Sequence, residues 1–251
     1  KQQQQEIRIQ LASSTTCLMS NIVFVYCFSK QVSVTEEQYA IILEVLNESV
    51  NLLKRFFSYR IVTDDLTYED LKNLSPNIEI VNSENFVFLD DFKIELIKGL
   101  KENEILIDPD ILMKKRAKYS LDADLVFEHK EEVTDWYGKV IEEIKGTLLY
   151  DRIKNHQKLT FVPNIGILKI NHPNLLSDYI ETYYLYRKDL LSKFKTNQSI
   201  YSNLLGQYLL GILLQEGNYS YFYLRSVNTP KVYIHLAGPQ KYKKLNQKTV
   251  I

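Results

Sequence analysis

Two carboxylates stand two residues apart in the stretch NEILIDPDILMKK. Asp108 and Asp110 follow the apolar run Ile105-Leu106-Ile107, and a short apolar run that ends in acids indicates a buried strand delivering charge to a sheet edge. The intervening proline has no N–H to donate, so strand pairing is expected to stop there. Neighbouring carboxylates repel each other unless a cation or a proton lies between them. The pair therefore predicts a cation site, with an acidic Asp-Pro turn as the alternative.

A second group of functional side chains stands near the other end of the chain, in YIHLAGPQKYK. His235, Gly238 and Lys241 follow one another in the order H-x-x-G-x-x-K. The histidine offers a nitrogen ligand, the glycine permits close backbone approach, and the lysine neutralises phosphate. Together these residue types predict a site for a metal-bound diphosphate. The alternative is a histidine that satisfies only a local hydrogen bond.

Two further polar features interrupt apolar segments. Asn164 and Gly166 form an N-x-G pattern inside FVPNIGILKI, where the glycine lets a ligand or backbone approach and the asparagine offers a donor and an acceptor. Gln207 lies in the otherwise apolar SNLLGQYLLGIL, and a buried amide must find a partner. The alternatives are a strand kink for the glycine and a structural partner for the amide.

The elements that must position these residues alternate in the first half of the chain. Strands are predicted at 21–28, 59–65, 78–82 and 104–110, with helices at 35–57 and 89–100. The first helix opens on Thr35-Glu-Glu-Gln38, which has the form of a capping box. This βαβ order predicts a mainly parallel sheet flanked by helices, and ligands of such folds gather at the carboxyl ends of the strands. The two acids after 105–107 belong to that edge.

The second half of the chain is less regular. Strands are predicted at 122–129, 161–170, 219–224 and 231–236, and helices at 174–194 and 199–217. No linker rich in glycine, proline or serine interrupts the chain, so 19–251 is expected to form one domain. Residues 1–18 are polar and rich in glutamine, and they precede Met19. We expect them to be an extension that is not native, with a genuine N-terminal arm as the alternative.

Composition excludes several classes of protein. The 251 residues are 45% hydrophobic and 25% charged, which is typical of a globular domain, and the longest apolar runs are too short to span a bilayer. Lysine plus arginine and aspartate plus glutamate both number 31, so there is no global attraction to nucleic acid. The two cysteines, Cys17 and Cys27, have no metal or redox spacing. A cytoplasmic protein is expected.

Four features in this order resemble the GT-A glycosyltransferases, and especially glycosyltransferase family 8. They are a strand ending in D-x-D, an N-x-G strand, a helix bearing glutamine and a late H-x-x-G-x-x-K, and they extend over residues 21–244. The resemblance implies a GT-A type fold, which is a Rossmann-like, mixed but mainly parallel sheet flanked by helices. It implies transfer of a sugar from a nucleotide-diphosphate donor, UDP-linked in most of the family, with retention of configuration and with Mn²⁺ (or Mg²⁺) as cofactor.

The same resemblance implies roles for the residues that match the motifs. Asp108, Asp110 and His235 would be metal ligands, with Asp108 also facing the ribose. Lys241 would contact the diphosphate, and Gly238 would lie in the enclosing turn.

The sugar itself would be held by other matched residues. Asn164 and Gly166 would line its pocket, and Gln207 or Gln198, the candidate catalytic residues, would lie beneath it. The acceptor is not specified: a glycan, a protein, a small molecule and, less favoured, a nucleic acid all stay open.

The chain also departs from the family pattern. The acid that often precedes the helix glutamine is absent at both Asn197-Gln198 and Gly206-Gln207, and Tyr242-Lys243 stands where Pro-Trp often follows the lysine. One alternative is therefore an inactive module that binds nucleotide sugars. The other is a two-metal phosphoryl-transfer enzyme in which DPD acts with a second acidic pair, DAD.

Four more charged residues have open roles. Asp122 and Asp124 of DAD would flank the sugar pocket or cap a turn if they do not bind metal. Asp64 would contact the nucleoside of the donor or begin a helix. Lys93 is expected on a solvated helix face, with the nucleotide as its alternative contact.

Overall fold

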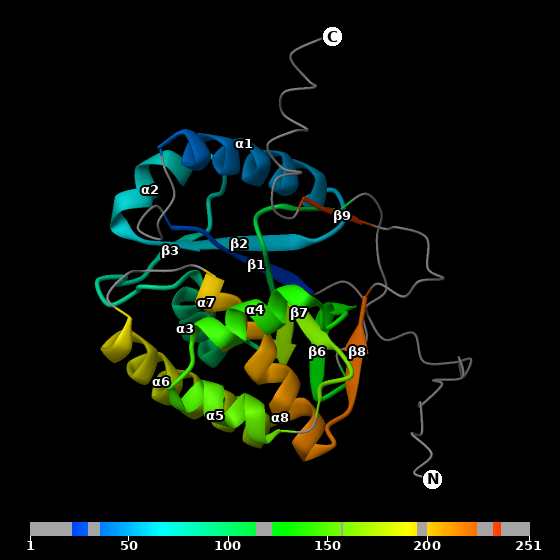
Figure 1. The fold of residues 1–251 in the computed structure, drawn as a ribbon. Coiled ribbons are helices and arrows are strands. Elements are labelled where there is room, and N and C mark those ends of the chain that lie inside the picture. The colour runs from blue at the N-terminus through cyan, green and yellow to red at the C-terminus, as the bar shows by residue number, and fades with distance from the viewer. Residues whose placement is uncertain are drawn as a thin grey trace, which may run out of the picture.

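The computed structural model describes residues 22–29, 36–113, 122–156, 158–194, 200–224 and 233–236. Its centre is a seven-stranded sheet between two layers of helices (Figure 1). Across the sheet the strands run in the order β3 (Ile78–Ile80), β2 (Ser58–Thr63), β1 (Val23–Cys27), β4 (Glu104–Ile107), β7 (Val162–Ile170), β6 (Leu125–Glu131) and β8 (Tyr221–Tyr223). Only β7 runs antiparallel to its neighbours. The predicted mixed, mainly parallel sheet flanked by helices is confirmed.

The helices cover both faces of the sheet. One face carries α1 (Glu36–Leu53) and α2 (Asp65–Leu71), drawn blue and cyan in Figure 1. The other face carries α3 (Leu89–Gly99), α4 (Asp135–Glu143), α5 (Leu148–Asn155), α6 (Pro173–Lys193), α7 (Ile200–Asn203) and α8 (Leu209–Gly217). No helix within the described ranges is long and apolar enough to cross a membrane.

Alternation along the central strands divides the apolar core in two. In β1, Phe24 and Tyr26 pack in the cluster beneath α1, whereas Val25 and Cys27 pack in the larger cluster beneath α3 and α6. Successive side chains of a strand point to opposite faces, so a strand covered on both sides must be apolar throughout. This is why β1 and residues 105–107 of β4 are continuous apolar runs.

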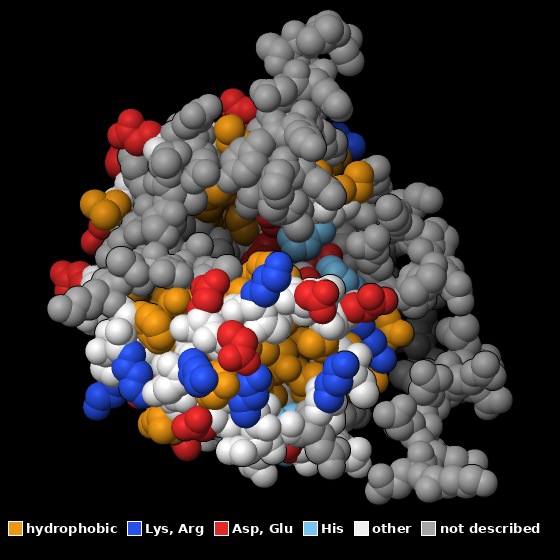
Figure 2. Space-filling model, in the orientation of Figure 1, with side chains coloured by type: hydrophobic (Ala, Val, Ile, Leu, Met, Phe, Trp, Pro, Cys, Tyr) orange, Lys and Arg blue, Asp and Glu red, His pale blue; other side chains and the backbone are white. Residues whose placement is uncertain are grey.

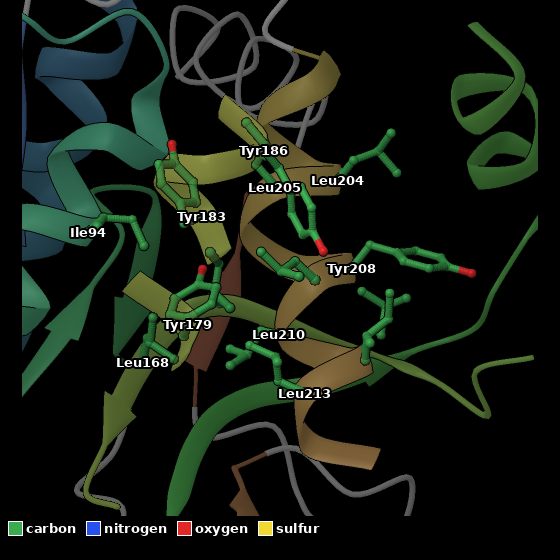
Figure 3. Close-up of a cluster of buried hydrophobic side chains, with 14 of the residues drawn as sticks. Ile94, Leu168, Tyr179, Tyr183, Tyr186, Leu204, Leu205, Tyr208, Leu210 and Leu213 are labelled. Atoms are coloured by element: carbon green, nitrogen blue, oxygen red, sulfur yellow. The ribbon is translucent and has the colours of Figure 1, made fainter. Parts of the chain in front are cut away.

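Tyrosines form much of the core between α6 and the segment before α8 (Figure 3). Tyr179 and Tyr183 are fully buried, and a buried phenol needs a hydrogen-bond partner. The Tyr183 hydroxyl donates to Asp91 Oδ1 at 2.9 Å, and the Tyr179 hydroxyl donates to the Gly206 carbonyl at 2.9 Å. The second bond fixes the backbone next to Gln207.

The helix predicted at 199–217 is interrupted. A π-helical segment, η1 (Leu204–Tyr208), separates α7 from α8, and the chain leaves α8 through Asn218 in the left-handed conformation. A π turn shifts the backbone bonds to i→i+5, as the bond from Leu209 N–H to the Leu204 carbonyl shows. The apolar pattern of the sequence does not predict this turn, because the side chains remain buried on either side of it.

A pair of short strands that the sequence did not predict as a pair lies apart from the main sheet. It consists of β5 (Ile111–Met113) and β9 (Tyr233–His235), which run antiparallel with Ile111 opposite His235. The two strands are more than a hundred residues apart in sequence, so no local signal links them. The pair brings the segment that follows Asp110, in the middle of the chain, beside the last described strand.

Candidate functional site

Asp108, Asp110 and His235 converge at the carboxyl edge of the parallel strands. Asp108 follows β4, Asp110 precedes β5, and His235 ends β9. One ligand atom from each residue lies within 4.8 Å of the others, and His235 Nε2 is 3.3 Å from Asp110 Oδ1. Divalent cations bind oxygen and nitrogen ligands at about 2.0–2.2 Å, so the ligand atoms around one ion lie roughly 3–4 Å apart. Two carboxylates and one imidazole could therefore hold one divalent cation.

The backbone fixes this arrangement from two sides. The N–H of Asp108 donates to the Gly166 carbonyl at 2.7 Å, and the N–H of Leu236 donates to the Asp110 carbonyl at 3.0 Å. Ser49 of α1 is fully buried and donates to the Ile111 carbonyl. The turn that carries both acids is therefore held between β7, β9 and α1.

A hollow lies beside this edge of the sheet. Figure 2 shows it between the upper helical layer and α4, with acidic side chains in its depth and histidine side chains at its side. The ends of parallel strands leave such a space because the chain turns away from the sheet there. The hollow gives a ligand access to the acidic edge.

Lys93 is not on a solvated helix face, and that prediction is wrong. Its side chain is 5% exposed, and its Nζ lies 2.7 Å from Oδ1 and 3.0 Å from Oδ2 of Asp108. Burial lowers the pKa of Lys93, but Asp108 and Asp90 outweigh this and raise it above the usual value. Burial raises the pKa of Asp108, and the positive charge of Lys93 offsets only part of that rise. A fixed ammonium group therefore partly neutralises the first acid of DPD.

A carboxylate that the motifs did not include lies behind the histidine. Glu128 is fully buried, and its Oε2 is 2.7 Å from His235 Nδ1. Burial raises the pKa of Glu128, but the hydrogen bonds of His129 and His235 lower it to about 2. Burial lowers the pKa of His235, and the bonds to Asp110 and Glu128 raise it to about 10. The histidine thus stands between two anionic groups.

Gly166 makes room for this pair. A Cβ atom at position 166 would lie 2.4 Å from Glu128 Oε2 and 3.0 Å from His235 Cε1. Real Cβ atoms essentially never approach other atoms within 3.0 Å. The atoms that approach Gly166 closely belong to protein side chains, and its predicted place in a sugar pocket stays a prediction.

The polar side chains beyond Gly166 form a connected network. Asn164 Oδ1 accepts from the Gly166 N–H at 2.9 Å, and its Nδ2 donates to Glu131 Oε1. Tyr137 of α4 donates to Glu131 Oε2 at 2.9 Å and reaches Gln207 Oε1 at 3.3 Å. The structure therefore links the asparagine and the helix glutamine that the sequence singled out separately.

Another carboxylate lies directly against the helix glycine that precedes Gln207. A Cβ at Gly206 would be 2.1 Å from Asp90 Oδ2, so the Asp90 carboxylate fills the place of a side chain there. Asp90 is 5% exposed, and burial raises its pKa to about 6, although Lys93 and a hydrogen bond with Ser202 oppose this. A carboxylate from α3 therefore lies beside the residue that precedes Gln207.

Asp64 begins a helix. It is the N-cap of α2, where Oδ1 accepts from the Thr67 N–H at 2.9 Å and Oδ2 accepts from the Ser29 hydroxyl. The helix-starting role is observed, and contact with a nucleoside stays a prediction. Gln198, Gly238 and Lys241 lie outside the described residues.

The second acidic pair lies at the opposite edge of the sheet. Asp124 precedes β6, and its Oδ2 accepts from the N–H and the hydroxyl of Ser220, both at 2.8 Å. Within the described residues β6 runs in the same direction as β4, because both are antiparallel to β7. The start of β6 is therefore far from the end of β4, and DAD cannot share a two-metal site with DPD.

Asp124→Ala tests this separation. Loss of two hydrogen bonds to Ser220 is expected to cost about 1–3 kcal/mol of unfolding free energy. Metal binding, measured by titration calorimetry with Mn²⁺, is expected to be unchanged. Loss of Mn²⁺ binding in a folded Asp124→Ala protein would contradict the placement of the two pairs.

Gly166→Ala tests the close approach at β7. The added methyl group has to displace the Glu128 carboxylate or the His235 ring, so a loss of about 1–3 kcal/mol is expected. Gly138→Ala in α4 is the matched control, because a Cβ there meets nothing within 4 Å and alanine favours helix by up to about 1 kcal/mol. Chemical denaturation of both variants measures the difference, and equal stability of the two would contradict the argument.

Sequence reasoning missed Glu128, Asp90 and the burial of Lys93. The stretch LVFEHKE offered one signal, since a strand that ends in four ionisable side chains at the carboxyl edge can contribute to the same site. Lys93 lies three residues after Asp90 on one helix, and this i,i+3 spacing puts them on one face. Which face is buried, however, follows only from the packing.

Comparisons with known proteins leave the family open. No protein-family model and no curated protein matches the sequence. Among solved structures the chain is similar to mouse xyloside xylosyltransferase 1, apo form, at 12% identity and a TM-score of 0.44 over 81% of this chain and 85% of that one. It is also similar to galactosyltransferase LgtC in complex with donor and acceptor sugar analogs, at 15% identity and a TM-score of 0.41 over 74% of this chain and 71% of that one.

A third solved structure is of another enzyme type. It is the 4-diphosphocytidyl-2C-methyl-D-erythritol synthase of Anaerococcus prevotii DSM 20548, at 12% identity and a TM-score of 0.39 over 92% of this chain and 99% of that one. All three TM-scores lie below 0.5, so these likenesses do not assign the chain to a family. Its function has to be inferred from its own residues.

Proposed function

We propose that this chain is a glycosyltransferase that uses a divalent cation to bind a nucleotide-diphosphate sugar and transfers the sugar to an acceptor. The observation that carries the proposal is the convergence of Asp108, Asp110 and His235 from two distant segments at the carboxyl edge of the sheet. Their order in the chain, D-x-D first and histidine last, matches the family-8 pattern. UDP-sugar as the donor and retention of configuration follow from that resemblance.

The donor set favours a hard cation. Two carboxylate ligands and one imidazole suit Mn²⁺ or Mg²⁺, and phosphate oxygens of the donor would complete the coordination. When bound, the cation would neutralise the negative charge that develops on the diphosphate as the glycosidic bond breaks.

The chain's own residues bind and orient the rest of the donor in this proposal. Lys93 holds Asp108 in place through both carboxylate oxygens. Asn164 and Gln207 present amide groups from the network beyond Gly166, where they would meet sugar hydroxyls. Asp90 would supply a carboxylate beside Gln207, because it lies against Gly206, the residue that precedes the glutamine. Lys241 would contact the diphosphate from the segment after β9.

The test is a thermal-shift and calorimetric screen of nucleotide diphosphates and nucleotide sugars with and without Mn²⁺. A nucleotide sugar that raises the unfolding temperature only when Mn²⁺ is present, and that slowly releases its nucleotide diphosphate, supports transfer. Metal-dependent binding without release of nucleotide diphosphate supports the inactive binding module. No metal-dependent binding of any nucleotide sugar contradicts both.

A further inference from the structure

Glu128 occupies an unusual place for a carboxylate. It is fully buried, and it stands at an irregularity in the pairing of β6 with β7, between Phe127 and His129. While β6 advances from Phe127 to His129, its partner goes from Leu168 to Asn164, so the extra residues lie on β7, opposite Glu128. Burying a carboxylate costs free energy unless it is paired and hydrogen-bonded, so its position calls for a specific reason.

Its contacts supply the reason. Glu128 Oε2 is 2.7 Å from Nδ1 of His235, and Oε1 is 3.3 Å from Nδ1 of His129. A separation of 2.7 Å is a hydrogen-bond distance, and in a bond between an imidazole and a carboxylate the ring nitrogen is the donor, which places a proton on Nδ1 of His235. The other ring nitrogen, Nε2, is the one that faces Asp110 Oδ1, at 3.3 Å. When the imidazole is neutral, the lone pair is therefore on Nε2, on the side of the two aspartates.

We propose that Glu128 is a positioning residue that fixes the tautomer and the orientation of the His235 ring, so that Nε2 is available to a divalent cation. The inference rests on the proposed metal site and deepens it. Carboxylates behind metal-binding histidines act in this way in general, and their loss costs about 10–100-fold in metal affinity. Gly166 is needed for the same contact, because any side chain there would displace the Glu128 carboxylate.

A purely structural role is the competing explanation. Glu128 also contacts His129, and a buried ion pair of this sort can hold strands together without any function. The two explanations differ in one respect: positioning acts only through His235. A double-mutant cycle between Glu128 and His235 therefore separates them.

The experiment measures Mn²⁺ affinity by calorimetry in four proteins: the unaltered chain, Glu128→Gln, His235→Ala and the double variant. Glu128→Gln keeps the shape and removes the charge, and it is expected to weaken Mn²⁺ binding by about 10–100-fold. In the His235→Ala background the same change is expected to have no further effect. Glu128→Asp, which restores a charge, is expected to recover part of the affinity, and His129→Gln is expected to change it by less than about twofold, as a change outside the pair does.

Two results would overturn the inference. One is Mn²⁺ affinity in Glu128→Gln equal to that of the unaltered chain, and the other is an equal loss with and without His235. A second measurement does not depend on metal: by NMR, the Nδ1 proton of His235 should exchange with solvent more slowly in the unaltered chain than in Glu128→Gln. If the chain binds no Mn²⁺ but this proton is protected, the proposed function fails and the Glu128–His235 contact stands. If the proton exchanges equally fast in both, the contact itself is wrong.

Discussion

Asp110→Asn is expected to abolish the stabilisation that Mn²⁺ and a nucleotide diphosphate give together. The variant replaces a charged ligand by a neutral amide at the point where Asp108 and His235 converge. Mutation of a residue that only supports a metal ligand can lower metal affinity by about 100-fold. Because Asp110 is itself a proposed ligand, its loss should lower Mn²⁺ affinity by more than that. The metal-free protein should stay folded, because the amide oxygen of Asn can still accept from His235 and its side chain no longer repels Asp108.

Thermal unfolding with and without Mn²⁺ and UDP measures this effect. Asp124→Asn is the matched control, since it makes the same chemical change at the other acidic pair, which lies at the opposite edge of the sheet. Full metal-dependent UDP binding by a folded Asp110→Asn protein would remove the D-x-D assignment.

Lys93→Met is expected to show the largest loss of stability, about 3–5 kcal/mol, because it removes one partner of a buried ion pair. Asp108 and Asp90 would then remain buried without their cation. Saturating Mn²⁺ should recover more stability in this variant than it adds to the unaltered chain. The reason is that Asp108 no longer shares its charge between the ammonium group and the metal.

Lys169→Met is the control for this rescue. Lys169 is also buried, but its Nζ donates to the backbone carbonyls of Lys101 and Glu104, at 2.7 and 3.0 Å. Its loss should also lower the free energy of unfolding. The stability that Mn²⁺ adds to this variant should be no larger than the stability that it adds to the unaltered chain. Denaturant titrations at several Mn²⁺ concentrations test both variants. An equal Mn²⁺ gain in Lys93→Met and in the unaltered chain would show that Lys93 does not share Asp108 with the cation.

The sequence by itself determined the central sheet and one edge of the site. Runs such as IVFVYCF and ILI are apolar at every position, and only a strand covered on both faces needs that pattern. The acids that follow EILI were assigned to the carboxyl edge because parallel strands end together. The order of the motifs predicts that His235 joins these acids, and it does so only through the family resemblance. No local pattern in the sequence links segments that are so far apart.

The tertiary structure alone decided which charges are buried and what they touch. The helix pattern of LDDFKIEL does not distinguish a lysine in solvent from a lysine against Asp108, since either face of the first turn can point inward. The antiparallel pair of β5 and β9, the contact of Glu128 with His235 and the π turn before α8 each depend on partners far away in sequence. Local preferences cannot specify such contacts, because their free energy appears only when both segments are already in place.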